Sequence, residues 1–211
     1  MSVSSPMFKI TQTTVSSIKS IPSCSETAST TFFAHGCNCL GNWGAGIALE
    51  LKELFPNAFE ADRQSCREVP SRASLPGTCL LISYETPSPL ASTNPAAPQV
   101  SIACLRTSLG FGRPNQKLGN PGLDNKERVV MQTRLALRDF RAQLEQMGEE
   151  RQKEIVIWSP KFNSGAFKVP WEETESLVEE VFAGWAGKWC VMQPPPVAEL
   201  KQWYGRRGAK K

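Results

Sequence analysis

The sequence predicts an α/β fold in which helices cover both faces of a central mixed sheet. Short apolar runs of strand composition alternate along the chain with longer segments that carry apolar residues at helical spacing. A chain of 211 residues with 40% hydrophobic and 21% charged residues is long enough to bury one core and has the composition of a globular protein. Glycine-rich segments follow several predicted strands, at the edge where α/β sheets bind ligands.

Six apolar runs predict strands. The run at 30–35 is buried and ends at His35, the only histidine of the chain. The runs at 78–85 and 100–108 are rich in β-forming residues and contain cysteine, which is typical of central strands. The remaining runs are residues 7–11, 154–160 and 188–192.

Two helices are predicted in the first half of the chain. Residues 46–55 have helical spacing, and Pro56 ends that helix. A second helix is expected to begin near Asn57, a favourable N-cap, and to continue through 58–68.

Two more helices are predicted in the second half. Residues 124–148 form a long amphipathic pattern, in which Asp124 and Glu127 have the spacing of a capping box and Gly148 is the expected stop. The last helix is predicted at 171–185, before the final strand.

The chain is predicted to form one domain, residues 1–193, followed by a Pro-rich and basic tail at 194–211. Residues 86–99 are rich in Pro, Ser and Ala, which indicates a flexible surface insertion in a hairpin-like connection.

Charge and hydropathy exclude several classes of protein. The sequence contains no run of about 18 apolar residues, so no membrane span is expected, and the N-terminus lacks the pattern of a secretory signal. The net charge of +4 is small and lies largely in 206–211, so nucleic-acid binding is not expected. We expect a cytoplasmic or nuclear monomer.

The seven cysteines predict reduced thiols, since their number is odd and most lie in apolar strand-like runs. Cys37 and Cys39 form C-x-C rather than C-x-x-C, and only one histidine is present, so no metal site is expected. No cofactor is implied.

Three glycine-rich segments leave predicted strands, at 36–46, 109–122 and 161–170. Two of them lead straight into helices, an arrangement that gathers backbone amides and helix N-termini and suits a phosphate. The first has the glycine order G-x-x-G-x-G, which is neither the Rossmann nor the P-loop pattern. An anion cradle and a merely tight turn both explain it.

Two segments resemble the ligand loops of macro domains: 35-HGCNCLGNWGAGIALELKELFPNAFE-60 and 159-SPKFNSGAFKVPWEETE-175. The first contains His, Asn-Cys, Gly-x-Trp-Gly and Gly-Ile-Ala in order, and the second contains Asn-Ser-Gly followed by Phe and Pro-Trp. The combination is most similar to the fungal ADP-ribose 1''-phosphate phosphatase branch of that family. The resemblance covers most of the chain outside its two ends.

The resemblance implies a three-layer α/β/α macro domain with a central mixed sheet, which binds an ADP-ribose derivative. It places Asn38 at the distal ribose, although a turn-stabilising asparagine explains the same position. Trp43 is either a wall of the cleft or a core aromatic. The other residues implied in ligand binding are Gly41, Gly44, Ala45, Gly46, Ile47, Asn163, Ser164, Gly165, Ala166 and Phe167.

His35 is the candidate catalytic residue, because the resemblance places a histidine implicated in turnover here. An imidazole with a pKa near about 6.5 can transfer the proton that breaking a phosphate monoester requires; a structural histidine at a strand end is the alternative. Asp124 is the candidate acidic partner, with helix capping as its alternative. Arg113 and Lys117 are candidates for meeting the terminal phosphate, or are simply solvated.

Two departures from the macro-domain pattern bear on specificity. Many macro domains carry Gly-Asp near the first strand, where the Asp binds the adenine amino group, but Gln12 and Thr13 stand here. Hydrolases that remove ADP-ribose from proteins use a Lys and a Gly-Leu-Asp pair of loops, whereas 165–167 contains no Asp. The second departure argues against that hydrolase activity.

The resemblance therefore implies a phosphatase that converts ADP-ribose 1''-phosphate, which arises downstream of tRNA splicing, to ADP-ribose and phosphate. A non-catalytic ADP-ribose-binding module is the first alternative, since it shares both loops and does not need His35. A hydrolase of protein-linked ADP-ribose is the second.

Overall fold

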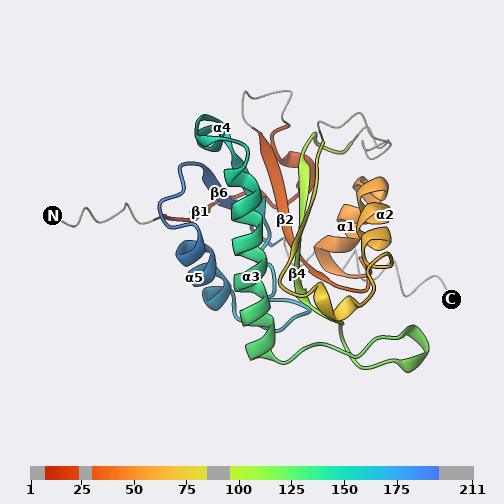
Figure 1. The fold of residues 1–211 in the computed structure, drawn as a ribbon. Coiled ribbons are helices and arrows are strands. Elements are labelled where there is room, and N and C mark those ends of the chain that lie inside the picture. The colour runs from red at the N-terminus through yellow and green to blue at the C-terminus, as the bar shows by residue number, and fades with distance from the viewer. Residues whose placement is uncertain (1–7, 24–29, 85–95, 195–211) are drawn as a thin grey trace.

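A computed structural model describes residues 8–23, 30–84 and 96–194. Its centre is a six-stranded sheet with the order β1-β6-β5-β2-β4-β3 (Figure 1). All neighbouring strands are parallel except β3 and β4, which are antiparallel, so the predicted mixed sheet is confirmed. The strands are β1 (Thr11–Gln12), β2 (Thr31–Asn38), β3 (Cys79–Ile82), β4 (Ser101–Ser108), β5 (Val156–Ser159) and β6 (Lys188–Val191).

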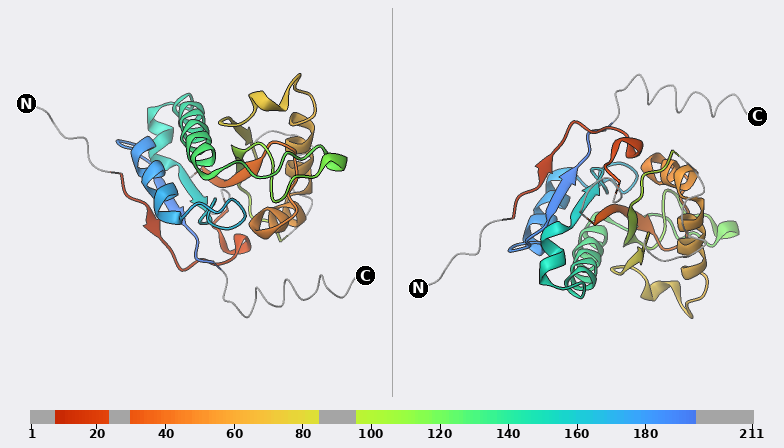
Figure 2. Two further views of the ribbon diagram at one scale, coloured as in Figure 1. Left: turned by 90° about the horizontal axis from the view of Figure 1, so that it is seen from below. Right: turned by 90° about the horizontal axis from the view of Figure 1, so that it is seen from above.

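Helices cover both faces of this sheet. Helices α3 and α5 lie on one face, with α4 at the end of α3, and α1 and α2 lie on the other (Figures 1 and 2). The three-layer α/β/α architecture is therefore confirmed. The helices are α1 (Gly46–Leu54), α2 (Pro56–Ser65), α3 (Lys126–Glu145), α4 (Glu149–Glu154) and α5 (Trp171–Val181), with short 3-10 turns η1 (Ile18–Ser20), η2 (Arg72–Ser74) and η3 (Gln116–Leu118).

The central strand β2 is buried on both faces, as a strand between two helical layers requires. Its side chains alternate between the layers. Phe32 and Ala34 pack in the cluster beneath α3 and α5, whereas Phe33 and Cys37 pack in the cluster beneath α1 and α2. His35 has the same parity as Phe33 and so faces α1 and α2.

Strand β2 does not end at His35 as predicted. It continues to Asn38, pairing with β4 as far as Asn38 opposite Ser108, with a register shift after Cys37. His35 therefore lies inside the sheet, where neighbouring strands cover it, and not at the strand end from which a ligand loop leaves.

The long helix begins later than predicted, and Asp124 is not its cap. The N-cap is Asn125, whose side-chain oxygen accepts a hydrogen bond from the Arg128 N–H at 2.9 Å. The helix ends at Glu145, and Gly148, with a φ of 93°, separates it from α4. Helix α4 was not predicted from the sequence.

Smaller differences concern element ends. Helix α2 begins at Pro56, one residue before the predicted cap Asn57. Proline is favourable at the first position of a helix, because the N–H that it lacks has no hydrogen-bond partner within the helix there. Strand β1 is shorter than the predicted run at 7–11 and overlaps it only at Thr11. Helix α5 begins where predicted and ends earlier, at Val181. Of the predicted insertion, residues 86–95 lie outside the described residues, as do 195–211 of the predicted tail. None of the described helices combines the length and apolar character that crossing a membrane requires.

Candidate active site

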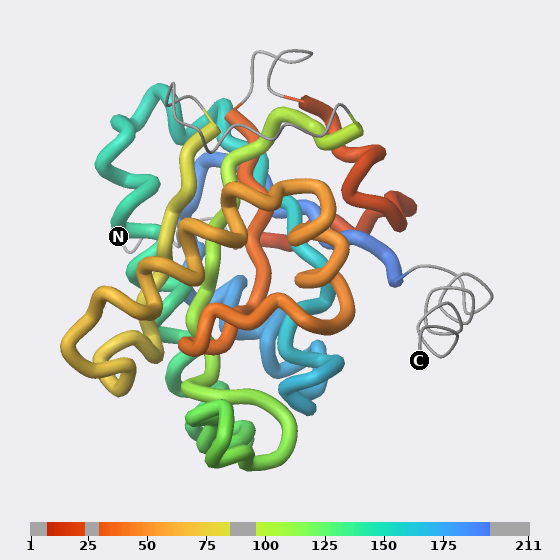
Figure 3. The backbone as a smooth tube through the Cα atoms, turned by 90° about the vertical axis from the view of Figure 1, so that its right-hand side faces the viewer, coloured from red at the N-terminus to blue at the C-terminus, as the bar shows by residue number. Residues whose placement is uncertain are grey.

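A cleft of about 980 Å³ lies at the carboxyl-terminal edge of the sheet. Two segments form nearly half of its lining: the first loop, residues 39–45 between β2 and α1, and the second loop, residues 160–170 between β5 and α5. Figure 3 shows these segments, in orange and cyan, at the same end of the sheet as the green segment after β4. This volume is typical of sites that enclose a small molecule.

The structure brings nearly all predicted ligand-binding residues to this cleft. Those that line it are Asn38, Trp43, Gly44, Ala45, Gly46, Ile47, Asn163, Ser164, Gly165, Ala166 and Phe167. Gly41 does not line it. Gly41 has a φ of 64°, and a Cβ there would lie 2.7 Å from the Arg63 Cα. A glycine is therefore needed for the first loop to turn closely against α2.

Asn38 organises the first loop through its own side chain. Its amide nitrogen donates to the Asn42 carbonyl at 2.7 Å, and its side-chain oxygen accepts from the N–H groups of Leu40 and Asn42 at 3.0 and 3.3 Å. These bonds are those of the turn-stabilising asparagine. The contact with a ribose remains a prediction.

The first loop delivers the N-terminus of α1 to the cleft. Its N-cap is Ala45, which offers no side-chain cap, and no acidic residue occupies the first turn. Ala45, Gly46, Ile47 and Ala48 all line the cleft. The positive end of the helix dipole and its backbone donors therefore face the cleft, an arrangement that favours an anion.

The second loop is held by Asn163, a buried residue with a φ of 65°. Its side-chain nitrogen donates to the Thr133 hydroxyl at 2.8 Å, and its side-chain oxygen accepts from the Thr107 hydroxyl at 2.9 Å. The Val169 N–H donates to the Asn163 carbonyl at 3.1 Å. Asn163 thus fastens the loop to α3 and β4, and the exposed stretch that follows, 164–166, faces the cleft.

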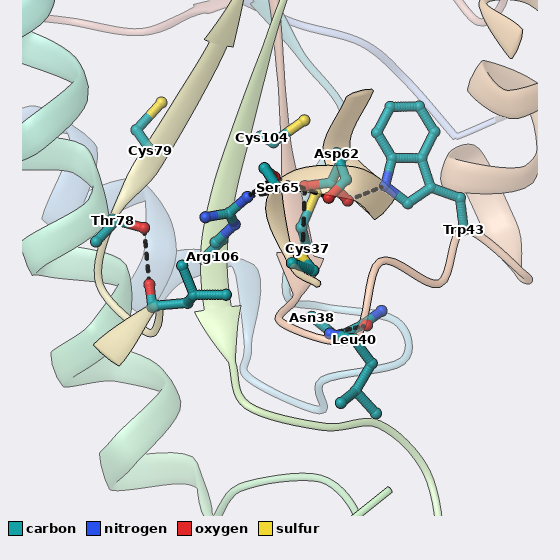
Figure 4. A network of polar contacts seen from close by, with 12 residues as sticks. Cys37, Asn38, Leu40, Trp43, Asp62, Ser65, Thr78, Cys79, Cys104 and Arg106 are labelled. Atoms are coloured by element: carbon teal, nitrogen blue, oxygen red, sulfur yellow. Dashed lines mark hydrogen bonds and ion pairs between the residues drawn. The ribbon is translucent and has the colours of Figure 1, made fainter. Parts of the chain in front are cut away.

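Trp43 combines the two alternatives left open by the sequence, because it lines the cleft and its ring packs in the core. Its ring is only 1% exposed, and its indole N–H donates to the Asp62 carboxylate at 3.0 Å (Figure 4). The other Asp62 oxygen lies 3.3 Å from an Arg106 nitrogen, which also donates to the Ser65 hydroxyl. Burial raises the pKa of Asp62, while the Arg106 guanidinium and the Trp43 N–H oppose that rise.

His35 does not reach the cleft. Its side chain is fully buried, its ring lies 4.7 Å from the Trp43 ring in an edge-on contact, and it is absent from the cleft lining. Burial lowers its pKa from 6.5 to about 3, so the imidazole is neutral at physiological pH. This mid-strand position differs from the strand-end position of the structural alternative, and it does not support direct proton transfer to a substrate.

His35, Cys37 and Cys104 form one cluster of metal-ligand side chains, with ligating atoms within 4.8 Å of one another. The Cys37 sulfur is 3.6 Å from Nδ1 and 3.4 Å from Nε2, so it lies along neither lone pair. Burial raises the pKa of both thiols, which favours their protonated forms. In the described part of the chain no fourth residue joins them, and the arrangement does not fit a tetrahedral zinc site.

Asp124 fastens the segment after β4 to α3 rather than facing the cleft. One of its oxygens accepts from the Leu109 N–H at 2.7 Å and from the Gln132 side chain at 3.3 Å. Neither Asp124 nor the exposed Arg113 and Lys117 lines the cleft, so their predicted contacts with a water or a phosphate are not supported by their positions.

Several cleft residues were not predicted: Ser16, Glu50, Phe111, Lys161 and Gln193. Lys161 lies just after β5, within the second segment that resembles macro-domain ligand loops. That resemblance could have identified it as a cleft residue. Glu50 lies on α1 beside the apolar face marked by Ile47 and Leu54, and a charged residue there gave no sign that it would line a cleft. Phe111 lies in the glycine-rich segment 109–122, which the sequence placed at this edge, whereas Ser16 and Gln193 come from parts of the chain that only the tertiary fold brings here.

Similar proteins agree with this architecture. No family model matches the sequence. The ADP-ribose 1''-phosphate phosphatase of Debaryomyces hansenii is 34% identical over 167 residues, covering 74% of this chain and 86% of that protein. That of Neosartorya fischeri is 33% identical over 172 residues, covering 69% and 80%.

Solved structures show the same fold at low identity. A macrodomain protein from Streptomyces coelicolor superposes with a TM-score of 0.57 at 18% identity, covering 88% of this chain and 99% of that one. The macrodomain of Thermus aquaticus DarG gives 0.57 at 15% identity, covering 88% and 98%. With the relatives above, these findings confirm the resemblance of the two loops: the chain has the macrodomain fold and belongs to the ADP-ribose 1''-phosphate phosphatase family.

Proposed function

We propose that this protein hydrolyses ADP-ribose 1''-phosphate in the cleft and releases ADP-ribose and inorganic phosphate. Its relatives carry the name of that activity. The observation that carries the proposal is the uncapped N-terminus of α1, which lines the same cleft as the exposed stretch 164–166 of the second loop.

The cleft suits the anionic part of this substrate. The first turn of α1 offers backbone donors without a competing carboxylate, and Gly165 has no neighbouring atoms where a side chain would project. Backbone groups of both loops can therefore approach phosphate oxygens closely. Lys161 is the one ammonium group among the described residues that line the cleft.

The reaction needs charge stabilisation more than covalent participation by the protein. Water attacks the phosphorus atom, the bond from phosphorus to the O1'' oxygen breaks, and the attacking water supplies the proton that the departing oxygen takes up. Fixed donors aimed at the phosphoryl oxygens lower the barrier to this step, because they need no reorganisation as charge develops. Neither His35 nor Asp124 has a place in this mechanism. The substrate's origin in tRNA splicing, a monomeric state and a cytoplasmic or nuclear location remain predictions from the sequence.

A second candidate is a protein that binds ADP-ribose without turnover. One observation favours it: the described titratable residues that line the cleft are Cys37, Glu50 and Lys161, and burial keeps the Cys37 thiol protonated. A protein that only binds the ligand needs no acid or base.

Phosphate release from ADP-ribose 1''-phosphate, measured together with ADP-ribose binding by calorimetry, separates the two candidates. Steady release by the wild-type protein, at a rate well above that of a heat-denatured sample, supports the phosphatase. Binding without release would leave only the binding protein. As a check on the site, Lys161→Met should weaken both readouts, whereas Lys168→Met, on an exposed residue outside the cleft lining, should change neither.

A further inference from the structure

The charged groups of the cleft are few and of opposite sign. Glu50 is the one carboxylate, as Lys161 is the one ammonium, among the described residues of its lining. A partly buried carboxylate is an unusual wall for a site that takes a phosphorylated ligand, because it repels every phosphate group near it.

Glu50 lies at a definable end of the cleft. Its carboxylate accepts a hydrogen bond from the Ile18 N–H, which joins α1 to the segment after β1. The Gln193 N–H donates to the Val15 carbonyl at 2.9 Å, which joins the same segment to the end of β6. Figure 3 shows this segment in red and the end of β6 in blue, on the side of α1 away from the segment after β4.

The three phosphate groups of the substrate repel a carboxylate, whereas the hydroxyl groups of its riboses and the amine of its base can each donate a hydrogen bond to one. The base is the terminal group at the end of the substrate away from the 1''-phosphate, so a carboxylate at one end of the cleft suits the base. The adenine base carries an exocyclic amine, a donor with two N–H groups. A carboxylate accepts hydrogen bonds at both oxygens and has capacity beyond the one bond from Ile18.

Resting on the proposed function, we propose that Glu50 is a specificity residue that accepts a hydrogen bond from the exocyclic amine of the substrate base. The base then lies between Glu50 and the residues after β1 and β6, and the terminal phosphate lies at the far end of the cleft, towards Gly112 and Phe167. The position where the resemblance placed a base-binding acid carries no carboxylate, and neither Gln12 nor Thr13 lines the cleft. Gln12 donates to Glu175 at 2.8 Å, and the Thr13 hydroxyl donates to the Val191 carbonyl at 2.9 Å.

Glu50 can accept a hydrogen bond in either protonation state, because even a protonated carboxyl group keeps acceptor capacity. Burial raises the pKa of Glu50, the Ile18 N–H and the nearby Lys19 oppose that rise, and the Glu53 carboxylate adds to it. If Glu50 only tethers α1 to Ile18, its loss should weaken the binding of every ligand of the cleft equally. If Glu50 binds the base, its loss should weaken adenine ligands more than ligands with another base, so the base is the group to vary.

The test compares adenine and hypoxanthine ligands. Hypoxanthine replaces the exocyclic amine by an oxygen, which a carboxylate repels. We expect the wild type to show a KM for ADP-ribose 1''-phosphate, and a Kd for ADP-ribose, about tenfold lower than for the hypoxanthine analogues, the size of one hydrogen bond to a charged group. Glu50→Ala should remove this preference, mainly by weakening the adenine ligands.

Glu50→Gln gives the sharper result. The glutamine oxygen can still accept from Ile18, while its amide N–H can donate to the hypoxanthine oxygen, so the preference should narrow or reverse. Glu53→Gln, on an exposed residue of the same helix, removes a neighbouring charge that raises the Glu50 pKa but leaves the Glu50 carboxylate in place, so this control should retain the preference for adenine.

Equal weakening of both bases in Glu50→Ala, or no change in either, would overturn the inference. Failure of the phosphatase is a separate outcome, because binding of ADP-ribose and its hypoxanthine analogue reports on Glu50 even without phosphate release. Absence of release with a base preference that depends on Glu50 would refute the proposed activity and leave the specificity residue standing.

Discussion

His35 and Asp62 are polar side chains that the fold removes from water beneath the first loop. Sequence alone identified His35 as the only histidine and placed it near the phosphate loops. Its burial could not be predicted from composition, because it depends on β2 continuing past His35 and on side-chain alternation pointing the ring beneath Trp43. Asp62 lies on α2 at a position where an acidic residue would normally be solvated, and only its partners Trp43 and Arg106 explain its burial.

Burial of His35 predicts acid-sensitive stability. The folded-state pKa is about 3 and the ordinary value is 6.5, so the unfolded chain binds an extra proton between these pH values. The His35 contribution is complete above about pH 6.5 and falls as the pH decreases, by up to about 1.4 kcal/mol per pH unit below pH 6. Urea unfolding of wild type and His35→Gln at pH 7, 6 and 5 measures it. The two proteins should differ in slope, and parallel pH profiles would show that His35 is accessible to protons in the folded protein.

Breaking the Arg106–Asp62 ion pair should greatly reduce the free energy of unfolding, and neutralising Asp62 as well should restore much of it. Arg106→Leu leaves the Asp62 carboxylate buried with no cation beside it and only the Trp43 N–H and the weak Cys66 thiol donor as partners, which should reduce the free energy of unfolding by about 3–5 kcal/mol. The double variant Arg106→Leu with Asp62→Asn removes the charge but keeps an acceptor for Trp43, so much of the loss should return. Denaturant unfolding of the single and double variants provides the comparison. A double variant no more stable than Arg106→Leu would show that the guanidinium acts through packing alone.

At the scale of elements, the N-terminus of α1 connects fold and function most directly. Sequence patterns located this helix to within a residue of its observed end, because Pro56 cannot continue it. They also located both loops, since glycine order and the Asn-Ser-Gly segment are local features. The sequence could not show that Asn38 and Asn163 hold the two loops in place. That role depends on their hydrogen bonds with Asn42, Thr107 and Thr133.

Ala45 provides a test of the uncapped helix. Ala45→Asp should stabilise the protein by about 1 kcal/mol, since an aspartate caps the helix and matches its dipole. The same carboxylate occupies the anion-binding amides and should lower kcat/KM for phosphate release at least tenfold. Ala45→Asn is the control, because it caps the helix without charge and should reduce activity less. Thermal unfolding and initial rates measure both effects. Undiminished activity in Ala45→Asp would place the phosphates elsewhere.

On the scale of the whole molecule, sequence predicted the layers and the edge of the sheet that carries the site. Alternation of strand and helix patterns is sufficient for this, because it limits how a sheet can be covered. It could not predict which distant segments complete the cleft. Ser16 and Gln193 reach it through strand order, which places β1 beside β6, whereas the segment of Phe111 was expected here because it leaves β4. The specificity assigned to Glu50 therefore belongs to the assembled fold and not to a motif.

A ³¹P NMR time course of ADP-ribose 1''-phosphate with the wild-type protein follows each phosphorus atom of the substrate during the proposed hydrolysis. We expect the phosphate monoester resonance to disappear, inorganic phosphate to appear in equal amount, and the two diphosphate resonances to persist as those of ADP-ribose. A monoester resonance that remains while the protein binds the ligand would refute the phosphatase activity, and loss of the diphosphate resonances would show that a different bond is broken.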